Sequence, residues 1–280
     1  MAGRQEIQEE IHQSQALYVC AMKSANSRQL ILVTNDDGVY SKGILALTEA
    51  VLPFGDIVVV APDKPQSGMG HAVTISNLLR LHPLRYDLPV QAAFACSGTP
   101  VDCVKLAIYK VMHRKPDLVV SGINHGSNSS INVIYSGTMS AAVEGAVEGI
   151  PSIGFSLLDH SAEADFEASK QVVSKVVAAA LKNGIPLGTC LNVNIPKGQP
   201  SDIAGIRICH QAKGYWEDNF DVRTDPSGKP YYWLTGEFKL MDEGMDTDEI
   251  ALANNFVSIV PVHFDLTAYQ AMNELKNWNL

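Results

Sequence analysis

Short apolar runs alternate with helix-like segments between residues 29 and 155. Runs rich in Val, Ile, Leu and Ala predict strands at residues 30–34, 57–61, 92–96, 118–121 and 151–155. Apolar positions at the helical period predict helices at residues 43–52, 101–112 and 138–148. Strands that are apolar throughout are typical of parallel sheets that are covered on both faces. The pattern therefore predicts an α/β fold, with a three-layer α/β/α, Rossmann-like and mostly parallel sheet.

The rest of the chain first continues this pattern and then departs from it. Further helices are predicted at residues 162–181 and 266–277, and further strands at residues 191–195 and 257–261. Between about residues 210 and 250, aromatic and polar residues flank the turn sequence at 225–230, which predicts a protruding β-hairpin. Because an isolated hairpin is marginally stable in water, we expect this one to pack against another subunit.

The charge balance limits the kinds of partner that the chain can bind. Lys and Arg number 21 against 30 Asp and Glu, which gives a formal net charge of −9. Duplex DNA and anionic membranes bind concentrated positive charge, so we expect neither as a partner. The sequence also contains no apolar run of the roughly 18 residues that a membrane span needs. A small anionic ligand would have to be attracted by a metal ion or by helix N-termini.

Residues 1–28 differ in character from the rest of the chain. They are rich in Gln and Glu, and the apolar stretch 16–22 follows Glu6, Glu9 and Glu10 rather than a basic segment. A signal peptide is therefore not indicated, and we expect a cytoplasmic protein. We predict a poorly ordered N-terminal extension at 1–28, ahead of a single domain at 29–280. Met22 is an alternative start of the natural protein.

The cysteine pattern indicates neither a disulfide framework nor a zinc site. The chain has five cysteines, none of them in a C-x-x-C pair: Cys20, Cys96, Cys103, Cys190 and Cys209. An odd, scattered set is not what a disulfide-stabilised domain uses. We expect buried free thiols, because free Cys is among the most buried residue types.

Polar clusters follow the carboxyl ends of several predicted strands. These clusters are Asp36-Asp37, the loop around Ser67, residues 97–99 and residues 124–128. In open parallel sheets, ligands bind in the crevice beyond the carboxyl ends of the strands. We therefore expect the four loops to converge on one pocket.

Two interpretations fit the adjacent carboxylates Asp36 and Asp37. The sequence Asn35-Asp36-Asp37-Gly38 is common turn chemistry, so the aspartates can be plain turn residues. Alternatively they hold Mg²⁺ or Mn²⁺, which prefer oxygen donors and are bound by one or two carboxylates. A bound divalent cation would remove the repulsion between two neighbouring carboxylates.

The loop at 65–71 carries a hydroxyl and an imidazole, those of Ser67 and His71. Ser67 lacks the G-x-S-x-G context of a nucleophile elbow, so it is not interpreted as a covalent nucleophile. For His71 a structural role is favoured over that of a proton donor.

Ser136-Gly137-Thr138 leads into an alanine-rich helix, and its helix N-terminus is suited to bind an anion. The alternative is an ordinary N-cap. Ser97-Gly98-Thr99-Pro100 has the same physical character, with Asp102 in the first turn. Neither G-x-x-x-x-G-K-[ST] nor G-x-G-x-x-G is present, so P-loop and dinucleotide-binding classes lack their signatures.

Together these motifs resemble a known family. In order, they are Leu32-Val33-Thr34-Asn35-Asp36-Asp37-Gly38, Ala61-Pro62-Asp63 with Gln66-Ser67-Gly68, Ser97-Gly98-Thr99-Pro100, Ser121-Gly122-Ile123-Asn124-His125-Gly126-Ser127-Asn128 and Tyr135-Ser136-Gly137-Thr138. The set is similar to that of the SurE survival-protein family of divalent-metal-dependent 5′/3′-nucleotidases. The resemblance runs from about residue 29 to 268.

The resemblance implies a site and an assembly. It implies one divalent cation per subunit, Mg²⁺ or Mn²⁺, held by Asp36, Asp37, Ser67 and Asn124. It implies that a nucleoside monophosphate is bound through its phosphate by Asn128, Ser136, Gly137 and Thr138, with Thr99 nearby. Asp36 or Asp37 would also act in catalysis as the base. The hairpin and the C-terminal segment would exchange between subunits of a homodimer or homotetramer.

Residues 129–134 depart from the family pattern, where Gly and acidic residues are frequent, and this leaves the preferred nucleotide open. Two alternatives to a nucleotidase remain at this point. One is an exopolyphosphatase, since the site would hold a terminal phosphate. The other is a non-catalytic protein that senses a nucleotide or phosphate on the same scaffold.

Overall fold

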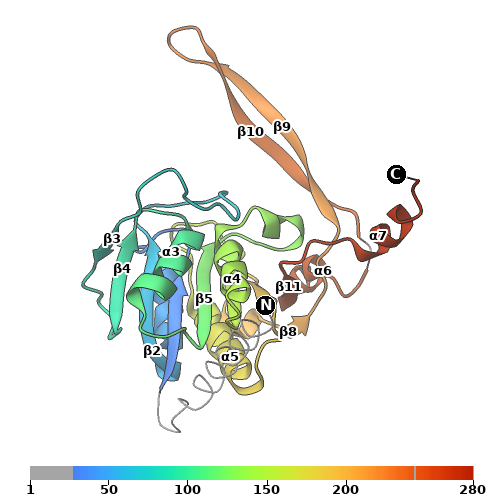
Figure 1. The fold of residues 1–280 in the computed structure, drawn as a ribbon. Helices are drawn as coiled ribbons and strands as arrows, with labels where there is room; N and C mark the ends of the chain where they lie inside the picture. Colours follow the sequence, from blue (N-terminus) through green and yellow to red (C-terminus); the bar gives the residue numbers. More distant parts are fainter. Residues whose placement is uncertain (1–27, 243, 280) are drawn as a thin grey trace, which may run out of the picture.

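A computed structural model describes residues 28–242 and 244–279 (Figure 1). Within these residues, nine strands form one sheet in the order β3-β4-β2-β1-β5-β6-β7-β11-β8. The strands are β1 (Gln29–Thr34), β2 (Gly55–Pro62), β3 (Leu81–Pro83), β4 (Ala92–Cys96), β5 (Leu118–His125), β6 (Ser152–Leu157), β7 (Thr189–Ile195), β8 (Gly205–Ile208) and β11 (Phe256–His263). Antiparallel pairing occurs at β3–β4 and β7–β11, and the other pairs are parallel. The predicted α/β fold is confirmed.

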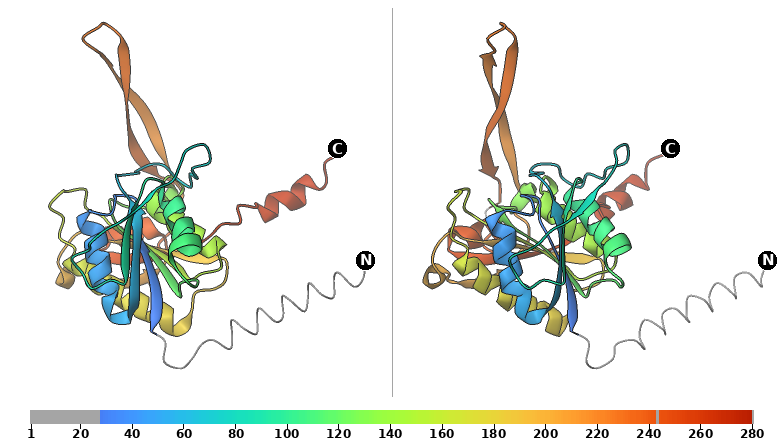
Figure 2. Two further views of the ribbon diagram at one scale, coloured as in Figure 1. Left: turned by 60° about the vertical axis from the view of Figure 1, so that its left-hand side comes forward. Right: turned by 90° about the vertical axis from the view of Figure 1, so that its left-hand side faces the viewer.

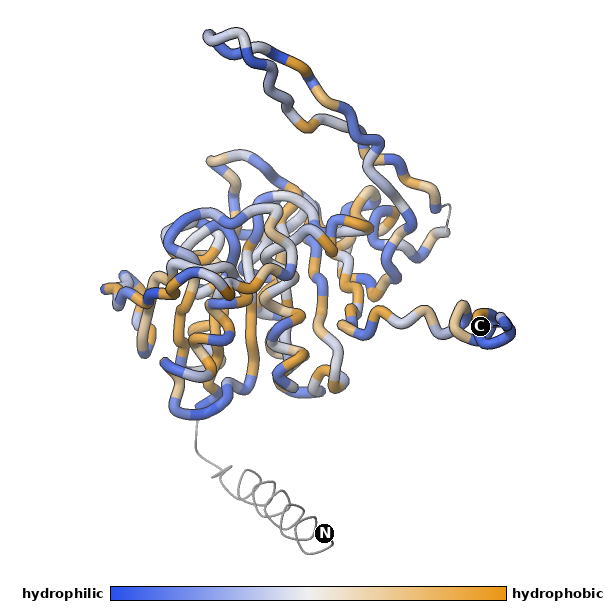
Figure 3. Tube along the Cα trace, turned by 45° about the horizontal axis from the view of Figure 1, so that its top comes forward, coloured by the Kyte–Doolittle hydropathy of each residue, from blue (hydrophilic) through white to orange (hydrophobic). Residues whose placement is uncertain are grey.

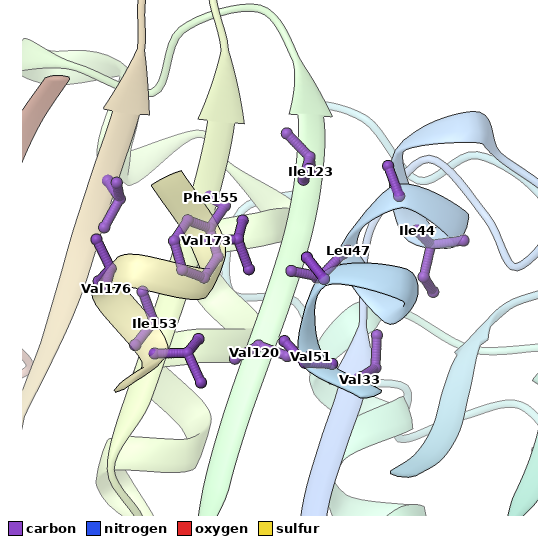
Figure 4. Close-up of a cluster of buried hydrophobic side chains, with 14 of the residues drawn as sticks. Val33, Ile44, Leu47, Val51, Val120, Ile123, Ile153, Phe155, Val173 and Val176 are labelled. Carbon is purple, nitrogen blue, oxygen red and sulfur yellow. The ribbon is translucent and has the colours of Figure 1, made fainter. Parts of the chain in front are cut away.

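Helices cover both faces of the sheet. Helices α2 (Lys42–Val51) and α5 (Glu167–Asn183) pack on one face, and α3 (Pro100–Leu106) and α4 (Gly137–Val147) pack on the other. The side chains of neighbouring residues in a strand point to opposite faces of the sheet. Val33 therefore packs under α2, while Leu32 packs under α3 and α4. Figure 4 shows the first of these cores, with side chains of α2 and α5 against side chains of the central sheet. Figure 3 shows the same concentration of apolar residues in the strands.

Several boundaries differ from the sequence prediction. Helix α5 begins at Glu167 rather than near residue 162, because the carboxylates of Asp159 and Asp165 accept backbone N–H groups of Ser161 and Glu167 and hold turns there. The helix predicted at 101–112 is α-helical to Leu106 and continues as a π-helical turn, Ala107–Val111. Helix α7 (Tyr269–Leu275) is shorter than the predicted 266–277. The short edge strands β3 and β8 were missed, since they lack a continuous apolar run.

The predicted hairpin is present and projects far from the body of the protein (Figures 1 and 2). It consists of β9 (Gly214–Thr224) and β10 (Pro230–Leu240), which pair with each other. Asp225 closes its turn by accepting the N–H groups of Ser227 and Lys229. Helix α6 (Asp248–Ala253) follows, and after β11 the chain leads α7 away from the body as well.

Three further predictions concern the chain as a whole. Cys96, Cys103, Cys190 and Cys209 are free and buried as predicted, whereas Cys20 lies outside the described residues. The predicted N-terminal extension and the alternative start at Met22 also lie outside the described residues, apart from residue 28. In the part of the chain that the structure describes, no helix combines the length and apolar character that a bilayer crossing requires.

Candidate metal and phosphate site

The carboxyl ends of β1 and β5 bring two of the polar motifs together. These strands are neighbours in the sheet, and Thr34 is in register with Ser121. Asp36 and Asp37 therefore follow β1 beside the segment of β5 that carries Asn124. The backbone N–H of His125 lies 3.4 Å from Oδ2 of Asp37. Two of the four loops that were predicted to converge are thus neighbours in the structure, and a single pocket formed by all four stays a prediction.

The turn after β1 is held by Asn35 and not by the two aspartates. The side chain of Asn35 donates to the carbonyl of Gly38 at 3.0 Å and accepts its N–H at 3.2 Å. The same amide donates to the hydroxyl of Ser41, the N-cap of α2. The two interpretations of this motif are therefore compatible, because Asn35 makes the turn and leaves both carboxylates for other partners.

Asp36 is the more buried of the two carboxylates. Asp36 is 3% exposed, and its Oδ1 accepts a hydrogen bond from the hydroxyl of Thr138 in the first turn of α4. A Cβ atom added to Gly137 would lie 2.7 Å from Cβ of Asp36, so only glycine allows α4 to start this close. The pKa of Asp36 is raised to about 6, chiefly by burial and also by the neighbouring charge of Asp37, while the hydrogen bond from Thr138 lowers it.

Asp37 is half-buried, and its environment differs from that of Asp36. Burial raises its pKa, while the N–H and the ring of His125 lower it. Two adjacent carboxylates whose charged forms are both disfavoured by burial are stabilised by a divalent cation.

Two backbone hydrogen bonds, one on each side of Ser67, hold the Ser67 loop at this site. The N–H of Gln66 donates to the carbonyl of Asp36 at 2.7 Å, and the N–H of Gly70 donates to the carbonyl of Tyr135 at 3.2 Å. Ser67 lies between these two anchors and is exposed. Its hydroxyl therefore belongs to a loop whose ends contact the Asp36 turn and the segment before α4.

Asn124 and Asn128 are both held by local hydrogen bonds. The amide nitrogen of Asn124 donates to the carbonyl of Gly126 at 2.9 Å, so the oxygen Oδ1 is the atom that a cation can use. Asn128 is 5% exposed, and its amide donates to the hydroxyl of Ser156 at 2.7 Å.

Two asparagines on β7 that the sequence reasoning missed hold Asn128 in place. The carbonyl of Asn128 accepts from the amide of Asn192 at 2.7 Å, and its N–H donates to Oδ1 of Asn194 at 2.8 Å. Asn194 in turn donates to Asn192 at 2.9 Å. The sequence did carry a signal for this role, because Asn192 and Asn194 are amides at alternate positions of a largely apolar strand, and buried amides need hydrogen-bond partners.

Ser136 caps α4, since its hydroxyl accepts the N–H of Met139 at 3.0 Å. The N-cap interpretation is correct for this residue, and it leaves the anion-binding interpretation open, because the first N–H groups of a helix have no partner within it. Gly137 and Thr138 occupy these first positions, directly against Asp36. The N-terminus of α4 therefore contacts Asp36.

Thr99 and His71 are engaged with other parts of the protein. Thr99 forms a capping box with Asp102 at the start of α3, and its hydroxyl donates to the carbonyl of Ala72 at 2.7 Å. A direct role of Thr99 toward phosphate stays a prediction. Nε2 of His71 lies 2.9 Å from Oε2 of Glu144, in agreement with the structural role that the sequence favoured.

Known proteins are similar to this chain in sequence. A family model described as "Survival protein SurE" matches residues 31–218, more than half of the chain. The chain belongs to the SurE family. It is 57% identical over 254 residues to "5′-nucleotidase SurE" of Christiangramia forsetii, which covers 90% of this chain and 98% of that protein. It is 58% identical over 255 residues to the protein of the same name from Flavobacterium johnsoniae, with 91% and 98% covered.

A solved structure of the SurE family agrees with this fold. The SurE protein from Aquifex aeolicus is 41% identical, with a TM-score of 0.76, and the match covers 88% of this chain and 98% of that one.

The donor set of this SurE-family chain suits a hard cation. Among the described residues, no three His, Cys, Asp or Glu side chains gather where they could hold a metal ion. A cation at this edge of the sheet would therefore rely on the two carboxylates together with neutral oxygens such as those of Ser67 and Asn124. Mg²⁺ and Mn²⁺ accept such a set, whereas zinc sites use His and Cys. The residues present fit the implied metal.

Proposed function

We propose that this chain is a divalent-metal-dependent 5′/3′-nucleotidase that hydrolyses nucleoside monophosphates to nucleoside and phosphate. Its reaction class is that of a phosphoric monoester hydrolase, because relatives at 57% and 58% identity over nearly their whole length are named 5′-nucleotidase. The observation that carries the proposal is the contact of buried Asp36 with Thr138, the second residue of α4. This contact joins a cation-binding carboxylate to an anion-binding helix end.

Four side chains would hold one divalent cation, either Mg²⁺ or Mn²⁺. They are those of Asp36, Asp37, Ser67 and Asn124. When bound, the cation would neutralise phosphate charge and lower the pKa of a water molecule to a value that favours attack on phosphorus. The raised pKa of Asp36 supports this assignment, because a nearby cation offsets the cost of a buried negative charge.

The phosphate would be held by the start of α4. The N–H groups of Gly137 and Thr138 and the hydroxyl of Ser136 are donors at the positive end of the helix dipole. Such preorganised donors stabilise charge on the phosphoryl oxygens of the transition state. Asn128 adds an amide whose position is set by Ser156 and by β7.

A carboxylate of the pair would take the proton from the attacking water. Asp37 suits this task better than Asp36, because it is only half-buried and its Oδ1 makes no hydrogen bond within the described residues. Asp36 is engaged with Thr138 and is more enclosed. Both residues therefore count as catalytic in this proposal.

Phosphate release from AMP tests the function directly. We expect release with Mg²⁺ or Mn²⁺, loss with EDTA, and loss in Asp36→Asn while circular dichroism stays unchanged. Near-normal release by Asp36→Asn with metal present would refute the site. A panel of 5′- and 3′-nucleoside monophosphates and short polyphosphate separates a nucleotidase from an exopolyphosphatase. Binding of AMP without release would indicate a sensing protein.

We also propose that two copies exchange their C-terminal arms. A groove of about 750 Å³ lies between α4, η3 (Ser130–Ile134) and the end of β11, and apolar side chains line much of it, among them Val133, Ile134, Val143, Val147, Val262 and Phe264. The C-terminal arm is the segment that follows β11 and includes α7. It carries exposed apolar residues at three-residue spacing: Leu266, Tyr269, Met272 and Leu275. The matching segment of a second copy suits the groove, because both surfaces are apolar.

The hairpin gives the homodimer a second contact, or joins dimers into a tetramer. Three pairs that face each other across its strands, Trp216 with Phe238, Phe220 with Leu234 and Val222 with Tyr232, lie on the same face of the ribbon. Five of these six side chains are exposed and the sixth, Phe238, is partly exposed. An unpartnered apolar face on a two-stranded ribbon is stabilised by burial against another copy.

A cytoplasmic location completes the proposal. The four described cysteines are free, as thiols remain in a reducing compartment. The net charge of −9 supports the expectation that neither DNA nor an anionic membrane is a partner.

A further inference from the structure

One buried carboxylate connects three elements that carry parts of the candidate site. The side chain of Glu144, in the middle of α4, is 4% exposed. Its Oε2 lies 2.9 Å from Nε2 of His71, at the end of the Ser67 loop. Its Oε1 accepts a hydrogen bond from Nζ of Lys105 in α3. Glu144 therefore joins the Ser67 loop and α3 to the helix whose first turn contacts Asp36.

This carboxylate is charged although it is buried. Burial by itself would raise the pKa of Glu144, but the bonds from His71 and Lys105 outweigh it and the net pKa is lowered. A charged group inside a protein is tolerated where it is paired and hydrogen-bonded. Neither Glu144 nor His71 takes part in the proposed hydrolysis, so the pair needs another explanation.

The loop that His71 terminates has little internal support. Gly68 and Gly70 both adopt positive φ, 74° and 54°, and a Cβ on Gly68 would meet nothing within 4 Å. The anchor before Ser67 is the bond from Gln66 to Asp36. After Ser67, the N–H of Gly70 donates to the carbonyl of Tyr135, the side chain of His71 then holds the loop on α4, and the bond from Thr99 to Ala72 holds the next residue on α3.

We infer that His71 and Glu144 are positioning residues that hold the hydroxyl of Ser67 in place for the cation beside Asp36. The inference rests on the proposed function, because it assumes that Ser67 is a metal ligand. His71 lies four residues after Ser67, and its hydrogen-bond partner is Glu144, so its effect on the cation would pass through the loop. Groups that orient metal ligands in this way commonly change metal affinity about tenfold to 100-fold when they are removed.

Metal affinity measured on the full-length protein tests this inference. The Kd for Mn²⁺ is obtained from the electron paramagnetic resonance signal of free Mn²⁺. We expect His71→Leu, which has no donor, to raise this Kd about tenfold, and His71→Gln, which can still donate to Glu144, to stay within about twofold of the wild type. His210→Leu removes a more exposed His–carboxylate pair, formed with Asp246 at 3.2 Å, and is expected to leave the Kd unchanged.

A double-mutant cycle with Ser67 separates positioning from general stability. If His71 acts through Ser67, His71→Leu combined with Ser67→Ala binds Mn²⁺ no more weakly than Ser67→Ala alone. At saturating Mn²⁺, kcat of His71→Leu is expected within about twofold of the wild type, with only the half-saturating Mn²⁺ concentration raised.

Additive effects in the cycle, or an unchanged Kd in His71→Leu, would overturn the inference. His71→Asn is too short to reach Glu144 and provides the same measurement if His71→Leu fails to fold. Absence of Mn²⁺ binding by the wild-type protein would instead contradict the proposed function. A raised Kd in Ser67→Ala together with an unchanged Kd in both His71 variants would leave the proposed function intact and reject the positioning role.

Discussion

The hydroxyl of Thr138 donates a hydrogen bond to Oδ1 of Asp36 across a separation of 102 residues. It does so at the point where the first turn of α4 meets the carboxyl end of β1. The bond connects the residue we propose as a cation ligand to the helix end we propose as the phosphate site. The first predictions concern this contact.

Removing the hydroxyl of Thr138 is expected to weaken both the fold and the activity. In Thr138→Val the buried carboxylate of Asp36 loses a hydrogen bond, and bonds to charged groups contribute about 1.5–3 kcal/mol. We expect the free energy of unfolding of the EDTA-treated protein to fall by about that amount at pH 8, measured in urea. AMP hydrolysis should fall as well. Thr138→Ser keeps the donor and is the control; equal losses in both variants would contradict this explanation.

Protons and the cation are expected to compete for Asp36. The pKa of this carboxyl is raised from its ordinary value of 3.8 to about 6 by burial. Because a cation binds the deprotonated form, the affinity for Mn²⁺ should fall up to about tenfold for each pH unit below 6. Titrations of Mn²⁺ between pH 5 and 8 measure this slope. A flat affinity across the range would show that Asp36 is not a ligand.

The raised pKa of Asp36 also determines how the stability of the metal-free protein depends on pH. A carboxyl whose folded-state pKa lies above its unfolded value of 3.8 stabilises the fold fully below pH 3.8. This contribution is lost as the pH rises through about 6, so EDTA-treated protein should gain stability in Asp36→Asn at pH 8. Urea unfolding of wild type and variant at pH 8, both with EDTA, measures the difference. A less stable variant would contradict the raised pKa.

Adding metal is expected to stabilise the fold through the same residues. A ligand present at 100 times its Kd stabilises the folded state by about 2.7 kcal/mol. The Tm of the wild type should therefore rise with Mn²⁺ after EDTA removal, whereas Asp36→Asn should show little or no rise. Thermal unfolding followed by circular dichroism provides the measurement. An equal rise in the two proteins would place the cation elsewhere.

The two faces of the hairpin are expected to respond differently to a charge. Phe220 lies on the apolar face opposite Leu234, and its neighbour Asn219 lies on the other face opposite Thr235. Phe220→Asp should reduce the oligomer size measured by light scattering, while Asn219→Asp should leave it unchanged. An equal result for both variants would argue against assembly through the apolar face.

Removal of residues 266–280 tests the exchange of the C-terminal arms. If the arms of two copies exchange, the shortened chain should be monomeric or reduced to hairpin-linked dimers.

Local pattern determined the elements and most of their order. Apolar runs such as 30–34 and 57–61 specify strands that are buried on both faces, and this requirement already implies helices on both sides of a parallel sheet. The positions of Asp36 and Ser67 after two strands, and of Asn124 near the end of a third, also follow from the chain order alone. The start of α5 was misplaced, since the turns made by Asp159 and Asp165 compete with a helix that the apolar pattern permits.

Contacts between distant segments were decided only by the tertiary structure. The amino-acid sequence by itself determined a parallel sheet with acidic and hydroxyl residues at one edge, together with a family resemblance. It did not show that Asn192 and Asn194 support Asn128, or that Glu144 holds His71, because these pairs depend on which strands and helices become neighbours. Strand order arises from burial of the whole core, and it is this order that places β5 beside β1 and α4 against Asp36.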